Sequence, residues 1–299
     1  MKSNILLFIT AMIWGFAFVA QRAGMEFVGP FTFNAIRFAL GGISLLPFLI
    51  LNKKWKFDFK NFSDLKNKHF IYGGIVAGLI LFLGSAFQQT GIVYTTAGKA
   101  GFITGLYIIF VPLFGLFLKN KTSAGTWFGV IIAVLGLYLL SVTESFSIGL
   151  GDLLVLISGF FWAVHVLLIG KISPKTNPIQ LAFLQFIICS FLSFIAAVIS
   201  ETSTIKNIYI ASIPILYAGI CSVGIAYTLQ VVAQRKAHPA HAAIIMSLEA
   251  VFALIGGWLV LDETIPLRGL IGCALMLTGM LVSQLYSLMK NKTKILMSN

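Results

Sequence analysis

The sequence predicts an all-α polytopic membrane protein with ten transmembrane helices. Hydrophobic residues make up 59% of the 299 residues, charged residues make up only 10%, and the mean hydropathy is +0.97. So little charge cannot cover a surface that faces water, so the solvent of this chain must be largely lipid. The apolar residues also gather in runs of about 20, the length of helix that crosses the hydrocarbon core of a bilayer.

Charged residues and Pro or Gly punctuation divide the chain into ten such runs. They cover residues 4–22, 31–51, 70–90, 98–118, 124–141, 150–169, 178–199, 209–232, 238–260 and 266–287. A membrane β-barrel is excluded because its strands are half as long and alternate strictly. The first run follows Lys2 as a secretory signal would, but it is too long and no cleavage site follows, so we expect it to stay as the first helix.

The net charge of +12 is explained by orientation in a cell membrane. With the N-terminus in the cytoplasm, the lysine-rich segment 53–68 and a basic tail at 288–299 both fall on the cytoplasmic side, as the positive-inside rule requires. The opposite side keeps few basic residues and most of the acids: Arg22, Lys99, Lys206, Arg268, Glu26, Glu144, Asp152, Glu201, Asp262 and Glu263. Both termini should be cytoplasmic, and the basic segments are given no nucleic-acid ligand.

The two halves of the chain resemble each other at an offset of about 148 residues that shrinks along the chain. The matching positions include Trp14 with Trp162, Pro30 with Pro178, Arg37 with Gln185, Tyr72 with Tyr217, Gln89 with Gln234, Tyr107 with Glu249, Gly129 with Gly272 and Gly136 with Gly279. Each half, 1–141 and 150–287, holds five predicted helices, so the second half must be inverted in the membrane. Inverted repeats with a ligand site near the midplane are typical of carriers that work by alternating access.

Several segments carry a family resemblance over nearly the whole chain. They are W-G-F-A-F at Trp14, the stretch from Ser85 to Pro112, Ser247-Leu248-Glu249, and the Leu261-Asp262-Glu263-Thr264 turn. On these segments the chain resembles the drug/metabolite transporter superfamily, specifically its ten-helix members with two EamA-type domains. The family often has Pro after the S-L-E triplet, and Ala250 stands at that position here, which leaves a helix break at that point open.

The resemblance implies secondary export or exchange of metabolites, amino acids or drugs. It also implies that the fifth and tenth helices lie outside the cavity. Their glycines Gly129, Gly136, Gly272 and Gly279 would then serve packing within the chain or a homodimer contact.

Two charged residues inside predicted spans are candidate substrate ligands, because a charge at mid-span costs roughly 2.5–3.5 kcal/mol on insertion scales. Arg37 shares a polar stripe with Asn34 on the second helix and either holds an anionic group of the substrate or clamps helices together. Glu249 in the ninth helix either binds a proton or a cationic group during transport or pairs permanently with Arg37 or with hydrogen-bond donors. We predict that it faces the central cavity in either case.

Uncharged polar and aromatic residues complete the predicted substrate site. Tyr107 is the repeat equivalent of Glu249, and Gln185 is that of Arg37. The amides of Gln88 and Gln89 can replace water around a zwitterion. Trp14 and Trp162 either line the cavity or fill the core. His165, His238 and His241 are interpreted as structural or helix-end residues, and Gln230 and Gln234 as contacts between helices.

The expected function is secondary transport of a small metabolite, such as an amino acid, with export as the expected direction. The alternative is a multidrug or cationic-compound exporter; an intramembrane enzyme or a channel fits less well, since no H-E-x-x-H, nucleophile or filter motif is present. No phosphate-binding loop occurs, so the driving force is a solute gradient or a coupled proton. No cofactor, metal or disulfide is expected, because Cys189, Cys221 and Cys273 lie in apolar spans without paired spacing.

Overall fold

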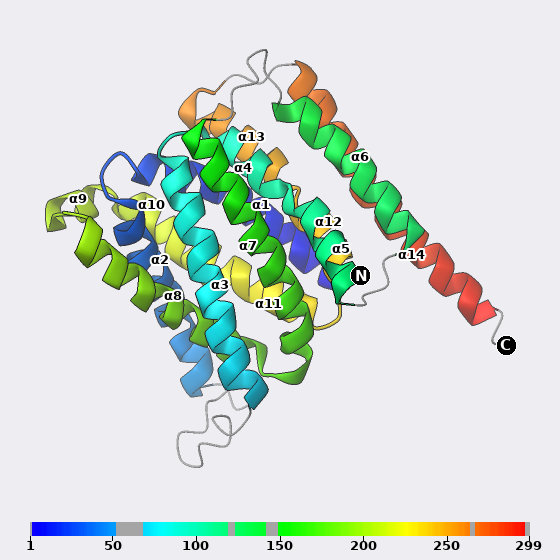
Figure 1. The fold of residues 1–299 in the computed structure, drawn as a ribbon, viewed down its shortest axis with the longest axis horizontal. Helices are drawn as coiled ribbons and strands as arrows, with labels where there is room; N and C mark the ends of the chain where they lie inside the picture. The colour runs from blue at the N-terminus through cyan, green and yellow to red at the C-terminus, as the bar shows by residue number, and fades with distance from the viewer. Residues whose placement is uncertain (1, 52–67, 119–122, 142–148, 264–266, 297–299) are drawn as a thin grey trace.

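Helices are the only regular elements in the part of the chain that the computed structural model describes, residues 2–51, 68–118, 123–141, 149–263 and 267–296 (Figure 1). They are α1 (Lys2–Gly24), α2 (Pro30–Leu51), α3 (Lys68–Ile92), α4 (Ala97–Gly105), α5 (Tyr107–Phe117), α6 (Ala124–Ser141), α7 (Leu150–Ile172), η2 (Ser173–Lys175), α8 (Pro178–Ser200), α9 (Ile205–Ile210), α10 (Ser212–Leu216), η3 (Tyr217–Tyr227), α11 (Thr228–Gln234), α12 (Pro239–Met246), α13 (Glu249–Leu261) and α14 (Leu267–Leu296). Proline stands at the first position of α2, α8 and α12, where its missing N–H costs nothing.

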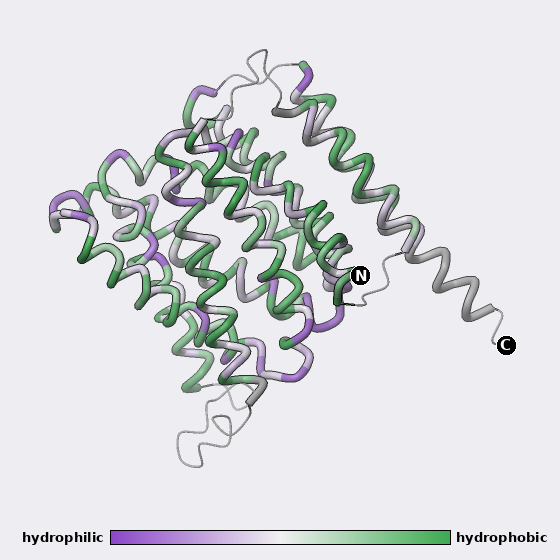
Figure 2. Tube along the Cα trace, in the orientation of Figure 1, coloured by the Kyte–Doolittle hydropathy of each residue, from purple (hydrophilic) through white to green (hydrophobic). Residues whose placement is uncertain are grey.

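Eight helical spans are long and apolar enough to cross a membrane, so the chain is a multi-pass membrane protein. Figure 2 shows hydrophobic residues along the helices and hydrophilic residues mainly at their ends and connections. The fifth and tenth predicted spans are present as α6 and α14, but their described apolar stretches, Ala124–Gly136 and Leu267–Ser283, are shorter than a full span. The number of ten crossings therefore stays a prediction.

Some predicted features lie outside the described residues. They include most of the lysine-rich segment 53–68, Lys119, Lys121, Glu144, Thr264 and the last three residues of the chain. The backbone of α14 continues as a helix to Leu296, through most of the predicted basic tail.

The predicted fourth and ninth spans are each split into two helices at equivalent points. The first break lies at Leu106, between α4 and α5, and the second at Ser247 and Leu248, between α12 and α13. At both points the backbone tightens into i→i−3 hydrogen bonds, such as Leu106 N–H to Ile103 O at 3.2 Å and Leu248 N–H to Ile245 O at 3.3 Å. The second break thus forms with Ala250 in the sequence, without a proline.

The eighth predicted span contains a wide-turn segment. Residues Tyr217–Tyr227 form the π-helix η3 between the short helices α10 and α11. Carbonyl groups of this segment accept hydrogen bonds from α1: Thr10 Oγ1 donates to Ala226 O at 3.2 Å, and Trp14 Nε1 donates to Ser222 O at 3.3 Å. Longer π-helical turns are rare and often accompany functional sites.

Packing between helices repeats from one half of the chain to the other. α1 packs against α13 as α7 packs against α5, and α3 packs against α7 as η3 packs against α1. α2 packs against η3 as α8 packs against α3. The pairs α2–α8 and α6–α14 each join two helices that are equivalent in sequence, so each pair is its own counterpart. Each pair therefore has its counterpart after the two halves are exchanged.

Helices α6 and α14 lie side by side along one edge of the bundle (Figure 1). Their backbones approach closely at glycines: a Cβ on Gly129 would lie 2.7 Å from the carbonyl oxygen of Gly279, and one on Gly136 would lie 2.5 Å from that of Gly272. These glycines therefore serve packing within the chain, and the homodimer contact stays a prediction.

Candidate functional site

A small cavity lies between the two halves, near the breaks of the split helices. Its walls combine polar, charged and aromatic side chains from both halves: Trp14, Phe18, Gln21, Arg37, Gln88, Thr104, Tyr107, Trp162, His165, Val166, Ser222, Tyr227, Gln230, Met246 and Glu249. The space open to a water-sized molecule is about 30 Å³, which admits about two water molecules. A solute of metabolite size needs the surrounding helices to move apart.

Arg37 brings a buried positive charge to this cavity, with no acidic partner among the described residues. Its side chain, on α2, is 1% exposed, and its guanidinium carbon lies 5.7 Å from the ring centre of Phe33 and 5.0 Å from that of Phe38. The two rings hold the cation by cation–π attraction and fix its plane. Its Nε and Nη2 atoms have no hydrogen-bond partner among the described residues, so they remain available to an anionic group.

Glu249 brings a buried carboxyl group to the same cavity from the second half. It is the first residue of α13, 3% exposed, and lies beside Tyr107, which is the first residue of α5. The helix break thus places its side chain at a half-helix N-terminus, where the helix dipole favours a negative charge. In the described chain the Oε1 atom has no hydrogen-bond partner and no ion pair joins Glu249 to Arg37. The permanent pair considered from the sequence is not formed.

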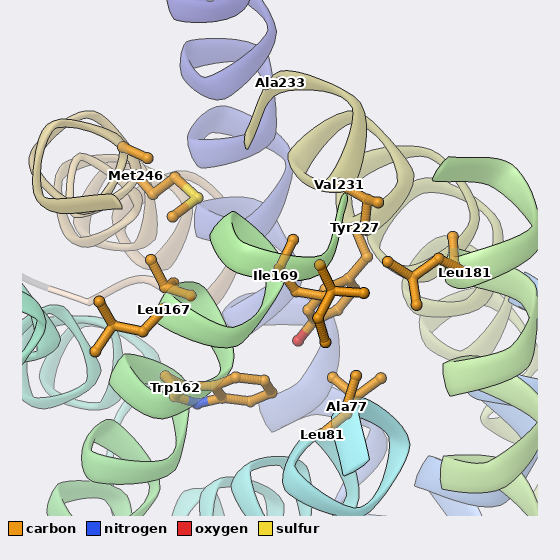
Figure 3. Close-up of a cluster of buried hydrophobic side chains, with 14 of the residues drawn as sticks. Ala77, Leu81, Trp162, Leu167, Ile169, Leu181, Tyr227, Val231, Ala233 and Met246 are labelled. Atoms are coloured by element: carbon orange, nitrogen blue, oxygen red, sulfur yellow. The ribbon is translucent and has the colours of Figure 1, made fainter. Parts of the chain in front are cut away.

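Aromatic rings form part of the same cavity wall. The ring centres of Trp14 and Trp162 lie 4.6 and 6.0 Å from that of Tyr227. Figure 3 shows the side chains of Trp162 and Tyr227 directed toward each other within the buried hydrophobic cluster. The indole N–H of Trp14 is bonded to Ser222 O, whereas that of Trp162 has no partner in the described structure.

Six of the nine predicted substrate-site residues line the cavity, and three lie behind it. The six are Trp14, Arg37, Gln88, Tyr107, Trp162 and Glu249. Asn34 instead donates through Nδ2 to Ser85 O at 3.1 Å, and Gln89 donates through Nε2 to Gln21 O at 3.4 Å. Gln185 lies 2.9 Å through Oε1 from His165 Nε2 and so supports a residue of the wall. Each amide thus has one group bonded to another helix, while its other group, Asn34 Oδ1, Gln89 Oε1 or Gln185 Nε2, has no partner in the described structure.

Several lining residues were not assigned to the site from the sequence. Phe18 and Gln21 follow Trp14 at i+4 and i+7, so helical spacing on α1 was a usable signal. Thr104 accepts a hydrogen bond from Gln88 Nε2 at 3.0 Å. His165 and Gln230 had been interpreted as structural, and Tyr227 had no signal, because the π-helix changes which residues of its span face inward.

The described residues contain no group of three or more His, Cys, Asp or Glu side chains that could hold a metal ion. The groups that surround the cavity can bind a polar solute. The same space is surrounded by the cation of Arg37, the carboxyl group of Glu249 and several aromatic faces. The indole N–H of Trp162 and the hydroxyl group of Tyr107 are two further donors that have no partner in the described structure.

Comparisons with known proteins indicate the family and the fold of the chain. Residues 1–142 and 149–284 match the model of the EamA-like transporter family. The chain is similar to an uncharacterized transporter of Archaeoglobus fulgidus, with 32% identity over 93% of this chain and 84% of that protein. It is also similar to the uncharacterized transporter YoaV of Bacillus subtilis, with 22% identity over 91% and 93% of the two chains. One solved crystal structure matches at a TM-score of 0.78 and 16% identity, over 95% of this chain and 97% of that one, which indicates a shared fold.

Proposed function

The chain belongs to the EamA-like transporter family, and from that premise we propose that it is a secondary active transporter that moves a small metabolite across the cell membrane by alternating access. The proposed substrate is an amino acid or a related zwitterion, and the proposed direction is export. The observation that carries the substrate class is the pair of buried, mutually unpaired charges in one cavity.

A zwitterion satisfies both charges at once. Its anionic group would accept hydrogen bonds from Arg37 Nε and Nη2, and its ammonium group would donate to Glu249. The rings of Trp14, Trp162 and Tyr227 would surround an apolar side chain. Burying an unpaired charge is costly, so binding a substrate that pairs both groups relieves a penalty that the empty site carries.

The proposed architecture is a ten-span protein made of two inverted five-helix repeats, 1–141 and 150–287, with both termini in the cytoplasm. The packing of helix pairs that recurs after exchange of the halves supports it. So does the occurrence of a split helix at equivalent points in each half, each opening with a cavity residue, Tyr107 or Glu249.

The proposed coupling ion is the proton, with Glu249 as its carrier. Glu249 is the only acid that lines the described cavity. Its neighbour Tyr107 offers a hydroxyl group, which can donate to the carboxylate when the proton has left.

A cationic-compound exporter is the second candidate. The carboxyl group of Glu249 amid aromatic faces also suits a planar organic cation. The two candidates differ in their use of Arg37, because a cation gains nothing from a neighbouring guanidinium.

Purified protein in liposomes, screened with amino acids, nucleosides and cationic dyes, tests the proposal. We expect saturable uptake with counterflow for a zwitterion, reduced about tenfold or more in both Arg37→Ala and Glu249→Gln, because each variant leaves one substrate charge unpaired. Glu26→Gln, at an exposed acid, is the matched control. If Glu249→Gln alone abolishes transport of a dye and Arg37→Ala does not, the second candidate replaces the first; normal zwitterion transport by both variants would contradict the site.

A further inference from the structure

Three carboxylates of the second half contact the first half at one end of the bundle. This end, called the distal end below, is the one at which α1 ends and α2 begins; it includes the connections that follow α8 and α13. The carboxylates belong to Glu201, Glu263 and Asp152, and none of them lines the cavity.

Glu201 holds the N-terminus of α2. Its Oε1 accepts from Phe31 N–H at 2.7 Å, and its Oε2 accepts from Thr32 N–H at 2.8 Å and from Thr32 Oγ1 at 2.7 Å. A Cβ on Gly29 would lie 2.7 Å from Oε1, so the glycine leaves room for this approach. A carboxylate bonded to the free N–H groups of a helix start forms charge-assisted hydrogen bonds and meets the positive end of the dipole.

Glu263 holds the N-terminus of α4 in the same way. Its Oε1 accepts from Ala97 N–H at 3.2 Å, and its Oε2 accepts from Gly98 N–H at 3.3 Å. The preceding residue, Asp262, ends α13 in the left-handed conformation with φ of 54°. This turn, costly for most residues but tolerated by Asp, directs Glu263 back toward the first half.

Asp152 adds an ion pair to the set. Its Oδ2 lies 2.6 Å from Lys99 Nζ, and its Oδ1 accepts from Thr95 Oγ1 at 3.0 Å. Since Lys99 and Thr95 flank the start of α4, that start is held by both Asp152 and Glu263.

We propose that Glu201, Glu263 and Asp152 form a latch that closes the distal end of the transport pathway. The inference rests on the proposed alternating access: the cavity lies between the halves, so opening it at this end separates α2 and α4 from the residues that hold their N-termini. All three contacts must then break together, and the latch sets how often the cavity is exposed at this end.

The sequence does not repeat two of these carboxylates in the first half. At the repeat offsets given above, the sequence equivalents of Glu201 and Glu263 fall at residues 53–56, three of which are lysines, and at Lys121, all outside the described residues. A lysine ammonium has no acceptor atoms, so it cannot replace a carboxylate in this contact.

Accessibility of a cavity residue measures the latch without knowledge of the substrate. We would replace Cys189, Cys221 and Cys273 by alanine, introduce Ser222→Cys as a reporter in the cavity wall, and measure its rate of reaction with a membrane-impermeant maleimide added outside right-side-out vesicles. Glu201→Gln and Glu263→Gln should each raise this rate about tenfold, because charge-assisted hydrogen bonds are lost only from the closed state. Glu26→Gln, which makes the same charge change at an exposed residue of the same end, should leave the rate unchanged.

Rates that stay equal in both latch variants and the parent would overturn the latch and leave the proposed transport function standing. A reporter that reacts from neither face in any variant would instead contradict alternating access itself. As a second measurement, Thr95→Cys with Asp152→Cys, joined by a short thiol-reactive linker, should stop net transport, and reduction of the linker should restore it. Full transport in the cross-linked protein would also overturn the latch.

Discussion

At the scale of single residues, the cavity is notable for polar atoms that have no partner in the described structure. Arg37 Nε, Glu249 Oε1, Tyr107 Oη and Trp162 Nε1 are all buried without a hydrogen bond. A buried polar group is costly to leave unpaired, so the gathering of such atoms around one cavity indicates a place where a ligand supplies the missing partners.

The two equivalent tryptophans allow a matched test of that interpretation. We expect Trp162→Phe to raise the KM of transport about fivefold without lowering the Tm, because its indole N–H is bonded to no described residue and is free for substrate. Trp14→Phe should instead lower stability by about 1 kcal/mol, because it leaves Ser222 O without its donor. Uptake kinetics and thermal unfolding of both variants measure the contrast, and equal behaviour of the two would contradict it.

At the scale of elements, breaks in helices position the chemistry. Tyr107 and Glu249 each begin a half-helix, and the π-helix η3 brings Ser222 and Tyr227 into the wall. The close pair α6–α14 contributes no lining residue and depends on backbone contact at glycine.

The α6–α14 contact predicts different responses to the same substitution at two glycines. Gly136→Ala should destabilise the protein by about 1–3 kcal/mol, because its Cβ would lie 2.5 Å from Gly272 O and 2.8 Å from Met276 N, both backbone atoms. Gly149→Ala should be tolerated, since its Cβ would meet only Asp152 Oδ2 at 3.8 Å. Thermal unfolding in detergent compares the two, and an unchanged Tm for Gly136→Ala would show that the helices are not packed this closely.

At the scale of the whole molecule, the two halves line the cavity together and are joined at the distal end. Hydrophobic clusters adjoin the cavity: one includes the lining residue Phe18, and a larger one includes Trp162 and Tyr227. So small a cavity suits an intermediate between the two open states of the proposed alternating access.

Inverted repeats predict the side of the membrane on which each connection lies. A cysteine at Ser145 should react with an impermeant reagent from outside the cell, and one at Lys60 only after the membrane is opened. Labelling of both positions from the same side would disprove the inversion of the two halves.

The sequence alone determined the class of fold, an all-helical membrane protein, and it predicted the repeat and six residues that line the cavity. Hydropathy over runs of about 20 residues is a local property, so it survives without tertiary information. Charged residues within apolar runs, such as Arg37 and Glu249, can also be recognised from the local sequence, because burying a charge in the membrane costs free energy whichever way the side chain points.

Only the tertiary structure decided which polar residues face the cavity and which join helices. Asn34, Gln89 and Gln185 look as suitable as Gln88 in sequence, but only Gln88 lines the cavity, and the other three each bond through one amide group to a neighbouring helix. Tyr227 lines the cavity as part of a π-helix. Glu201 and Glu263 accept hydrogen bonds from the N-termini of helices more than 160 residues away in sequence. Hydrogen bonds between segments so far apart depend on how the helices pack, and no local pattern encodes them.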